Sequence, residues 1–335
     1  MTDEAVVTGG LGPGALIAIT GATGFIGRHL LRELPKRGYR CRVLLRRPIE
    51  MQLDCASAVI GDLSRPQNLS AALEGIDAVV HSAGAPPGVS GIPEADHRLL
   101  DVEGTRQLAR AAQRARAKRF IFLSSIRAQC GPMTDDIITE KMTPAPTDTY
   151  GKSKLEAEQG LAELELDWVA LRPVLVYGPG MKGNFATLVN LARSPYPLPF
   201  GALKARRSLL SLDNLAEAVA SVLSTQVVLR RPLIVADPDA LTVSDMVSAM
   251  REGLGRRPGI ITVPAPILKL ALKAAGRGEW YDRLAGPLVV DPAALRGIGW
   301  TPKFSTREGL RRLITDSVQS DAMTHSSNIH REKIV

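Results

Sequence analysis

Apolar and polar residues follow two alternating periods through the first half of the chain. Short β-branched or apolar runs have the pattern of buried strands, and segments with apolar residues every three or four positions have the pattern of helices. The expected strands are Leu16–Thr20, Cys41–Leu45, Ala58–Ile60, Ala78–His81, Arg119–Ser124 and Trp168–Leu171, and the expected helices are Arg28–Arg37, Val102–Ala115 and Lys152–Leu164. Repeated βα units predict an α/β fold with a Rossmann-type, doubly wound parallel sheet.

The second half of the chain has a different texture. After Pro173, loops rich in proline and glycine separate shorter elements, including a helix near Asn214–Leu223 and a strand at Leu233–Ala236. This change predicts a smaller C-terminal lobe. We therefore expect a flexible extension over 1–14, a first domain over 15–173, the lobe mainly over 174–315 and a disordered tail over 316–335.

Charge and cysteine content narrow the class of protein. The formal net charge is +8, but the basic residues are scattered, and the densest stretch, Arg106 to Arg119, has the periodicity of a solvated helix face. This favours an anionic small molecule over a nucleic acid. The 3 cysteines show no CxxC spacing, so neither a disulfide framework nor a metal site is indicated. No apolar run reaches the roughly 18 residues of a membrane span, and we expect a cytoplasmic location.

A glycine motif follows the first expected strand. The residues Gly21, Gly24 and Gly27 lie in the run Thr20-Gly21-Ala22-Thr23-Gly24-Phe25-Ile26-Gly27. Gly21 permits a tight turn, Gly24 lets a pyrophosphate approach the backbone, and Gly27 permits close packing of helix on strand. The amides of the helix start, with Phe25 and Ile26, then face an anion. The motif predicts that 15–173 is mainly an NAD(P)-binding domain.

The end of the second expected strand bears on the choice of cofactor. An acidic side chain at this position would bond the ribose 2′-hydroxyl of NAD, whereas an arginine accommodates the 2′-phosphate of NADP. Here the strand ends Leu45-Arg46-Arg47. We therefore favour NADP(H) bound through Arg46, with NAD(H) still possible; simple solvation of these arginines is the alternative interpretation.

Tyr150 and Lys154 form a candidate proton-transfer pair. They are four residues apart at the start of an expected helix and so lie on one helical face. An ammonium beside a phenol favours the phenolate, which makes Tyr150 a general acid–base group near neutral pH. The same spacing occurs by chance in many proteins, but here it follows a strand that ends in Ser124-Ser125 and a chain start that reads TGATGFIG.

Taken together, these motifs resemble the extended short-chain dehydrogenase/reductase family, in particular its NAD-dependent epimerases and dehydratases. The resemblance runs from about Leu16 to Leu310. It implies that Ser125 hydrogen-bonds the reacting oxygen, with Tyr150 and Lys154 as the other catalytic residues. His81 is interpreted as a buried strand residue.

The same resemblance places further residues beside the cofactor. Gly61-Asp62-Leu63 is similar to the element whose aspartate meets the adenine, so Asp62 and Leu63 are expected there. Ala83 matches the strand end beside the cofactor, and Pro173 matches the strand that reaches the nicotinamide. One departure stands out: where the family usually has asparagine, this chain has Asp101. Aspartate cannot donate a hydrogen bond as asparagine does.

The C-terminal half is similar to one branch of the family, bacterial polysaccharide-pathway enzymes that act on UDP-sugars. Asn184 and Arg207 match positions that hold the UDP diphosphate, and Phe185 adjoins them. The resemblance implies a substrate-binding lobe and an oxidoreductase acting at C4 of a UDP-(N-acetyl)hexose in surface polysaccharide biosynthesis. It also implies a homodimer through the helices at Val102–Ala115 and Lys152–Leu164.

Several activities stay open. We favour a 4-reductase of a 4-keto-6-deoxy UDP-sugar; the alternative is a 4-epimerase of UDP-glucose or UDP-GlcNAc. A dehydratase is disfavoured, because that branch follows its serine or threonine with acidic residues and Ser125 is followed by Ile126-Arg127-Ala128. An alternative of another class is a non-catalytic NAD(P)-binding sensor or scaffold, although such proteins commonly lose the tyrosine or the lysine.

Overall fold

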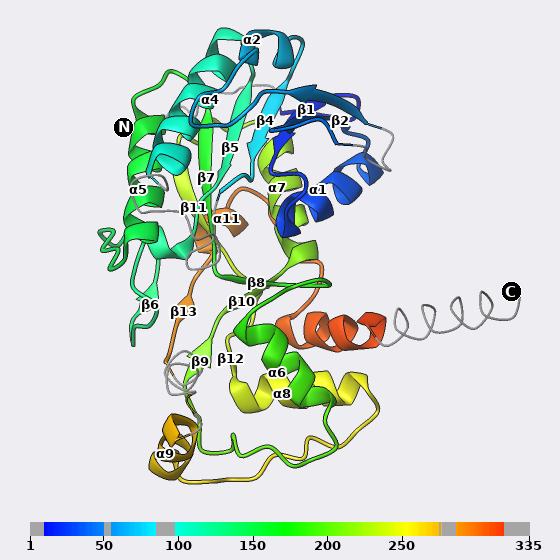
Figure 1. Cartoon of the computed structure of the whole chain (residues 1–335), viewed down its shortest axis with the longest axis vertical. Helices are drawn as coiled ribbons and strands as arrows, with labels where there is room; N and C mark the ends of the chain where they lie inside the picture. Colours follow the sequence, from blue (N-terminus) through cyan, green and yellow to red (C-terminus); the bar gives the residue numbers. More distant parts are fainter. Residues whose placement is uncertain (1–9, 50–54, 85–97, 275, 277–285, 318–335) are drawn as a thin grey trace, which may run out of the picture.

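The computed structural model describes residues 10–49, 55–84, 98–274, 276 and 286–317. A parallel sheet of seven strands forms its centre, in the order β11-β7-β5-β4-β1-β2-β3 (Figure 1). The strands are β1 (Leu16–Thr20), β2 (Arg40–Leu45), β3 (Ala56–Val59), β4 (Ala78–His81), β5 (Arg119–Leu123), β7 (Trp168–Pro173) and β11 (Arg231–Val235). The order reverses between β1 and β4, which is where open α/β sheets bind ligands. The predicted Rossmann-type, doubly wound fold is confirmed.

Alternating side chains along β1 explain why helices cover both faces of the sheet. Ile17 and Ile19 enter one apolar core and Ala18, between them, enters the other. The first core is shared with α1 (Phe25–Lys36) and α7 (Leu212–Ser224). The second is shared with α2 (Leu69–Ala72), α4 (Gly104–Arg114) and α5 (Thr149–Ala162) (Figure 1).

The C-terminal lobe has a third apolar core of its own, built around Tyr177, Leu188 and Met246. Its helices are α6 (Asn184–Arg193), α8 (Val243–Gly253), α9 (Ala265–Ala274) and a further helix over 306–317. Short strands join the lobe to the main sheet: β8 (Leu175–Tyr177) with β10 (Leu209–Ser211), β9 (Arg206–Arg207) with β12 (Leu241–Thr242), and β6 (Ile137–Ile138) with β13 (Val289–Val290). The lobe lies below the carboxyl edge of the sheet (Figure 1).

The predicted division at residues 173 and 174 needs a correction. The helix near Asn214–Leu223 and the strand at Leu233–Ala236 were expected in the lobe, but α7 packs on α1 and β11 pairs in parallel with β7. The chain therefore leaves the sheet after β7, begins the lobe, returns for α7 and β11, and leaves again. The reason is burial: the apolar side chains of α7 and β11 complete the first core.

The predicted terminal segments are only partly described. In the expected extension over 1–14, residues 1–9 lie outside the described range, but Leu11 is buried in the first core and its carbonyl accepts a bond from the Tyr39 hydroxyl at 3.1 Å. Within residues 10–14, Leu11 is therefore packed against the first core, whereas Gly12, Pro13 and Gly14 are exposed. The helix over 306–317 includes the first residues of the expected tail over 316–335, and 318–335 lie outside the described range.

A buried ion pair docks α5 on the sheet. The Arg172 guanidinium, on β7, donates from Nε to Glu158 Oε1 at 3.0 Å and also bonds Gln129. Glu158, on α5, accepts a further bond from the Ser124 hydroxyl at the end of β5. The charged groups of Arg172 and Glu158 are both almost fully buried. This network fixes the helix that begins with Thr149 and Tyr150 against two central strands.

A second buried ion pair holds the connection between α7 and β11. Arg119, at the start of β5, donates from Nε to Asp167 Oδ2 at 2.8 Å, and its two terminal nitrogens donate to the carbonyls of Thr225 and Val227, both at 2.9 Å. Asp167 accepts from the Leu229 amide at 2.9 Å. The carbonyls left open at the end of α7 are satisfied in this way, and β11 is guided into register beside β7.

The buried pair predicts a contrast between two glutamates of α5. Glu158→Gln leaves the Arg172 charge buried without its counter-ion, so we expect the free energy of unfolding to fall by about 3 to 5 kcal/mol. Glu156→Gln is the matched control, because Glu156 pairs with Arg98 at the surface; its cost should stay below about 1 kcal/mol. Urea unfolding followed by circular dichroism measures both, and equal losses would contradict the assignment.

Candidate active site

The glycine turn after β1 is set by close backbone contacts. Gly21 has a φ of 68°, and a Cβ there would lie 2.6 Å from the Ala83 amide nitrogen. A Cβ on Gly27 would lie 2.8 Å from Ala22 Cα. The nearest atom to a Cβ on Gly24 is the Gly21 carbonyl oxygen at 3.1 Å, so the protein crowds this position less. Gly21 and Gly27 are thus explained by packing, whereas Gly24 keeps the backbone open.

The start of α1 is suited to a phosphate. The helix is capped by Gly24 without a side-chain hydrogen bond, and its first turn carries no acidic residue. Phe25 and Ile26 are half-buried there, and the first amides of the helix have no side-chain acceptor from the cap. Such an N-terminus binds anions through its amides and its dipole. The residues present therefore fit the pyrophosphate of a dinucleotide.

The two residues predicted beside the adenosine lie next to each other. Arg46 follows the last residue of β2, is exposed, and reaches Asp62 Oδ2 at 3.8 Å. Asp62 accepts from the Ser64 amide at 2.9 Å and from its hydroxyl at 2.8 Å. The bond from the Ser64 amide is the main cause that lowers the pKa of Asp62, and Arg46 adds to it. Leu63, half-buried, packs against Gly104 at the start of α4.

Ser125 and Tyr150 are brought to neighbouring elements by a clamp at the start of α5. Ser125 caps a short 3₁₀ helix, η2 (Ile126–Ala128), by accepting from the Arg127 amide at 3.2 Å. Asp148 caps α5 by accepting from the Gly151 amide at 2.6 Å, and it also pairs with the Arg127 guanidinium. A Cβ on Gly151 would lie 2.9 Å from the Arg127 carbonyl carbon. The helix start therefore rests directly on the turn that holds Ser125.

Lys154 is buried one helical turn beyond Tyr150. Its Nζ lies 5.7 Å from the centre of the Tyr150 ring and 4.8 Å from that of Phe122. A Cβ on Gly84, three residues after the end of β4, would lie 2.9 Å from Nζ, so a larger residue there would press on the lysine side chain. The predicted face shared by Tyr150 and Lys154 is therefore present, with the ammonium close to the segment that follows β4.

Asp101 is the direct charge partner of Lys154. It lies in a π-helical turn, η1 (Leu99–Glu103), and its Oδ1 is 3.5 Å from Nζ, with both side chains buried. Its Oδ2 has no hydrogen-bond partner among the described residues. Asparagine would offer Lys154 a neutral amide, whereas Asp101 offers a full negative charge. The departure from the family pattern thus changes the electrostatics of the site.

His81 is a buried frame residue, as predicted. Burial, and then Lys154, lower the pKa of its imidazole to about 3, so the ring is neutral. Thr105 donates its hydroxyl to the Asp101 carbonyl at 2.6 Å, so His81 Nε2 must donate to Thr105 Oγ1 at 3.0 Å. His81 Nδ1 then accepts from the Thr20 hydroxyl at 2.6 Å, and Thr20 accepts from the Ala83 amide at 3.2 Å.

The predicted substrate residues are distributed unevenly. Asn184 is exposed at the first position of α6. Phe185 is buried in the lobe and stacks on Tyr177 at 5.9 Å between ring centres, so its ring is part of the core. Only its main chain is left to meet a ligand. Pro173 is buried at the end of β7, on the carboxyl edge of the sheet.

Arg207 lies near a second arginine that the motif analysis did not select. It is on β9 and donates to the carbonyls of Gly286 and Pro132. Burial lowers the pKa of Arg207, and the positive charge of Arg127 lowers it further. The Arg207 guanidinium therefore lies near that of Arg127, which is also paired with Asp148, and guanidiniums near each other can receive an anion. The sequence signal was the basic residue after Ser125, which had been used only against a dehydratase.

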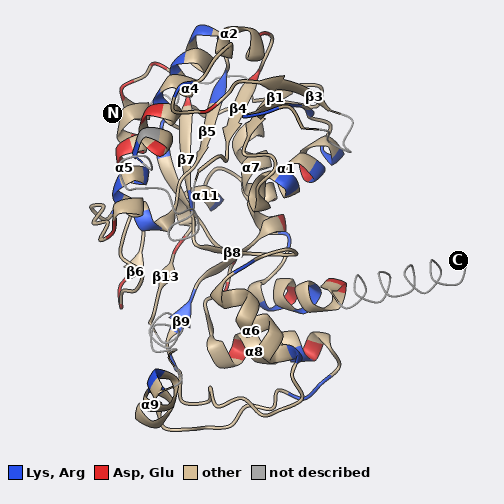
Figure 2. Cartoon of the chain, viewed as in Figure 1, with Lys and Arg blue, Asp and Glu red and all other residues tan. Residues whose placement is uncertain are grey.

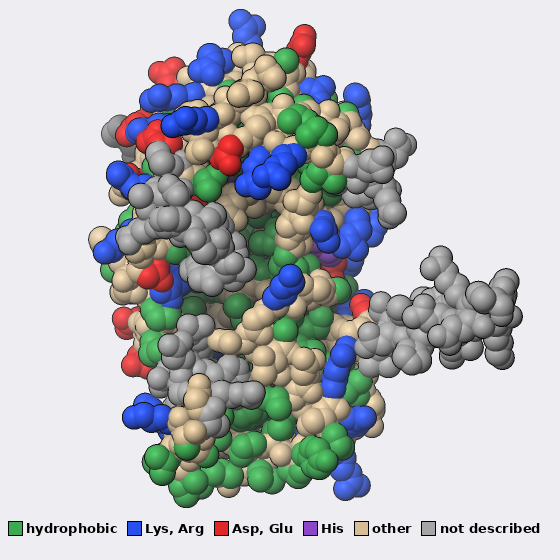
Figure 3. All heavy atoms as spheres, in the orientation of Figure 1, with side chains coloured by type: hydrophobic (Ala, Val, Ile, Leu, Met, Phe, Trp, Pro, Cys, Tyr) green, Lys and Arg blue, Asp and Glu red, His purple; other side chains and the backbone are tan. Residues whose placement is uncertain are grey.

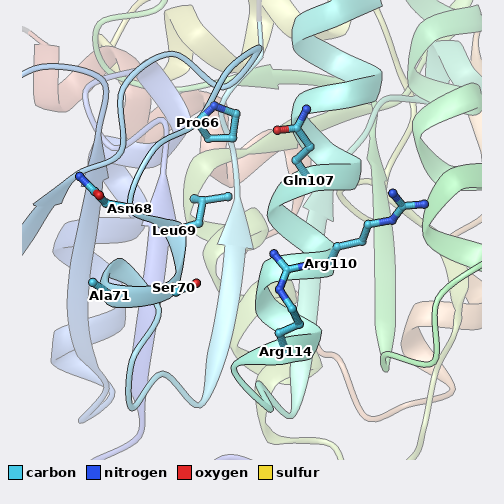
Figure 4. A pocket seen from close by; sticks show the side chains of 8 residues that line it. All are labelled: Pro66, Asn68, Leu69, Ser70, Ala71, Gln107, Arg110 and Arg114. Atoms are coloured by element: carbon cyan, nitrogen blue, oxygen red, sulfur yellow. The ribbon is translucent and has the colours of Figure 1, made fainter.

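One hollow of the surface is separate from this site. It measures about 610 Å³ and lies between α2 and α4 (Figure 4). Its lining residues are Pro66, Asn68, Leu69, Ser70, Ala71, Gln107, Arg110 and Arg114. None of them belongs to the glycine turn or to the Tyr150 clamp, so we assign it no part in the site.

Comparison with known proteins identifies relatives along most of the chain. It is 32% identical over 317 residues to the UDP-glucose 4-epimerase of Vibrio cholerae, covering 91% of this chain and 96% of that protein. It is 29% identical to the ceramide reductase of Caulobacter vibrioides, covering 86% of each. The solved structure of MoeE5 in complex with UDP-glucose and NAD has a TM-score of 0.69 and 26% identity, covering 91% of this chain and 99% of that one.

The family model named NAD dependent epimerase/dehydratase family matches residues 17–234, from β1 to β11. This range includes the glycine turn, Ser125, the Tyr150 clamp and Arg207. The chain therefore belongs to the NAD dependent epimerase/dehydratase family.

Proposed function

We propose that the chain is an NAD(P)-dependent oxidoreductase that acts at C4 of a UDP-(N-acetyl)hexose in surface polysaccharide biosynthesis, and that it reduces a 4-keto-6-deoxy UDP-sugar. The observation that carries the proposal is the clamp that sets Ser125, Tyr150 and Lys154 at the carboxyl edge of the sheet, beside the glycine turn. Support comes from the Vibrio cholerae relative and from MoeE5, which is described with UDP-glucose and NAD.

Each catalytic side chain has a separate task in this proposal. The Ser125 hydroxyl orients the sugar oxygen at C4, and the Tyr150 hydroxyl transfers a proton to or from that oxygen. The buried ammonium of Lys154, one helical turn away, holds a positive charge beside the ring of Tyr150. When bound, the nicotinamide supplies or accepts the hydride at C4. The glycine turn and the start of α1 would hold the pyrophosphate of the dinucleotide. Arg46 and Asp62 would meet its adenosine, and Leu63, Ala83 and Pro173 would line the rest of the dinucleotide site.

The diphosphate of the substrate is assigned to the lobe side of the cleft. Arg207 and Arg127 supply two guanidiniums, and Asn184 supplies an amide at the start of α6. The repulsion between the arginines is relieved when an anion binds to both, which adds to the affinity for a diphosphate. A neutral sugar without its nucleotide would gain nothing from this arrangement.

The choice of reductase rests on the cofactor end. A reductase exchanges its cofactor at every turnover, and we assign the 2′-phosphate of NADPH to Arg46, which is exposed beside Asp62. The second candidate is a 4-epimerase, favoured by the Vibrio cholerae relative. An epimerase keeps its cofactor and returns the hydride to the other face of the 4-keto sugar. A homodimer through α4 and α5 stays a prediction.

One experiment separates the candidates. The purified protein is incubated with UDP-glucose, UDP-GlcNAc and a 4-keto-6-deoxy UDP-sugar, each with and without added NADPH, and the products are identified by NMR. Reduction of the keto sugar that depends on NADPH supports the reductase. Epimerisation without added cofactor supports the second candidate. No conversion of any of the three would contradict both.

The assignment of the proton donor is tested by Tyr150→Phe. Loss of the phenol removes the acid–base group, so turnover should fall by about 10²- to 10⁴-fold while cofactor affinity stays nearly constant. Tyr196→Phe, which removes an exposed hydroxyl from the lobe, is the control and should retain full activity. Steady-state kinetics and cofactor titration by fluorescence measure both. Retention of half the activity in Tyr150→Phe would show the assignment to be wrong.

Cofactor preference is tested by Arg46→Asp. The substitution replaces attraction to a 2′-phosphate by repulsion, so the preference should change from NADPH to NADH by about tenfold or more. Arg47→Asp is the neighbouring control and should leave the preference unchanged. Fluorescence titration of the three proteins with both reduced cofactors gives the answer. A wild type that prefers NADH would remove the main support for the reductase.

The diphosphate site is tested by Arg207→Ala. Loss of a charge-assisted contact should weaken UDP binding about tenfold at low salt, and less at high salt because ions screen the contact. Arg206→Ala is the matched control: its guanidinium also donates to a carbonyl, that of Ala240, but it is exposed. Isothermal titration with UDP measures both. Equal affinities in the two variants would assign Arg207 a structural role only.

A further inference from the structure

The free end of the lobe exposes large apolar side chains. Tyr196 is 71% exposed, Leu270 is 70% exposed, Ile267 is 59% exposed and Ile261 is 49% exposed. Tyr196 and Leu270 are the two most exposed large apolar side chains among the described residues. Apolar atoms gather along this end of the molecule in the space-filling view (Figure 3). Contiguous apolar surface of this kind marks an interaction site.

These side chains come from segments that are joined to one another. The Leu198 amide donates to the Gly259 carbonyl at 2.9 Å, and the Ile261 amide donates to the Leu198 carbonyl at 3.0 Å. The loop that holds Tyr196 is therefore paired with the loop that holds Ile261. That second loop leads directly into α9, whose Ile267 amide bonds the Pro264 carbonyl at 3.0 Å. The three segments form the end of the lobe in Figure 1.

The helix α9 has an inner and an outer apolar face. Leu268 is buried in the core of the lobe, and Leu272 packs against that core one turn later. The outer face carries Ile267, Leu270, Ala271 and Ala274, which follow the spacing i, i+3, i+4 and i+7. All four are exposed. The fold buries only one face of α9, and a second apolar face of the same helix is exposed to solvent.

Among the described residues of the three segments that form this apolar surface, the charge has one sign. Between Asp167 and Asp213, and again between Glu252 and Glu279, the sequence contains no acidic residue. The segment from 253 to 274, which forms part of this end of the lobe, has the basic residues Arg256, Arg257, Lys269 and Lys273, all exposed (Figure 2). The two lysines lie in one row of α9, beside the outer apolar face. The surface thus combines an apolar centre with a positively charged edge.

We propose that this surface, formed by α9 and the loops around Tyr196 and Ile261, docks on an anionic lipid bilayer. An amphipathic helix with an apolar face and lysines beside it lies in the plane of a membrane interface. Basic side chains next to it are attracted by anionic headgroups. Within the described residues no helix is both long and apolar enough to cross a bilayer, so the contact is peripheral.

The sign of the charge favours a bilayer over a second copy of this chain. Two copies joined through this surface would bring the exposed Arg257 and Lys273 of each copy toward the basic residues of the other, which costs free energy. A bilayer with anionic lipids supplies both the apolar phase and the opposite charge. The inference does not depend on the activity proposed above, because none of its residues is assigned to catalysis or to cofactor binding.

Vesicle co-sedimentation of the full chain tests the proposal. The vesicles contain phosphatidylcholine with or without phosphatidylglycerol. We expect binding to those with phosphatidylglycerol, loss of at least about tenfold in affinity for Ile267→Ser/Leu270→Ser, and a loss of about fivefold per charge for Arg257→Glu and Lys273→Glu. The matched control is Ile137→Ser/Val227→Ser, which removes two exposed apolar side chains elsewhere and should leave binding unchanged.

Three outcomes would overturn the inference. The first is no binding of the wild type to either kind of vesicle. The second is an equal loss of vesicle affinity in Ile267→Ser/Leu270→Ser and in the control Ile137→Ser/Val227→Ser. The third is a concentration-dependent dimer, seen by sedimentation velocity, that Ile267→Ser/Leu270→Ser abolishes, because the apolar face would then join two copies. Circular dichroism and UDP titration of each variant show that the fold and the nucleotide site are retained.

Discussion

The buried pair of Arg172 and Glu158 is the interaction on which the geometry of the site depends. It joins the last turns of α5 to the centre of the sheet, and the Ser124 hydroxyl adds the end of β5 to the same carboxylate. The residues on either side of this network are Ser125, after β5, and Tyr150 and Lys154, on α5. Tyr150 and Glu158 lie on the same helix, so a shift of α5 along the sheet could not move the phenol without also separating a buried charge pair. Because misplacement of α5 would separate two buried charges, the pair helps to fix the positions of the three candidate catalytic groups.

A second pair, Lys154 with Asp101, acts closer to the chemistry. Both charges are buried, so neither ion is stabilised by water and each relies on the other. Gly84 lies close to both side chains, and a Cβ there would be 2.9 Å from Lys154 Nζ and 3.1 Å from Asp101 Oδ1. In consequence the position of the ammonium is set from three directions: by α5, by the π-helical turn and by the end of β4. The cost of burying two charges is offset only while all three elements are in place.

Much of the fold could be predicted from local pattern. The strands Leu16–Thr20 and Ala78–His81 have the predicted bounds, because buried central strands are short, continuous apolar runs with clear ends. Helix starts were less accurate: α1 begins at Phe25, three residues before Arg28, since the glycine cap carries no apolar signal. The expected helix from Val102 is instead a π-helical turn followed by α4 from Gly104. The return of α7 and β11 to the sheet was missed because parallel pairing is a long-range property.

The candidate site divides in the same way. Tyr150, Lys154, Ser125 and the glycines were selected because each lies in a motif with local spacing. Arg127, Asp148 and Gly84 were not selected, because their value lies in contacts between elements distant in sequence. Phe185 was assigned to substrate from its position next to Asn184, but its ring is a better fit to the apolar core than to a cleft.

The hydrogen-bond chain through His81 gives the site a fixed polarity. It begins at an amide, passes through a threonine, a neutral imidazole and a second threonine, and ends at the carbonyl of Asp101. Each hydroxyl donates once and accepts once, so no member can reverse without reversing them all. The imidazole stays uncharged far below neutral pH, and the chain that joins the glycine turn to the π-helical turn therefore keeps one arrangement of protons. The direction of its dipoles is set at both ends by the backbone, from the Ala83 amide to the Asp101 carbonyl, so the chain itself has no means of passing a proton in the opposite direction.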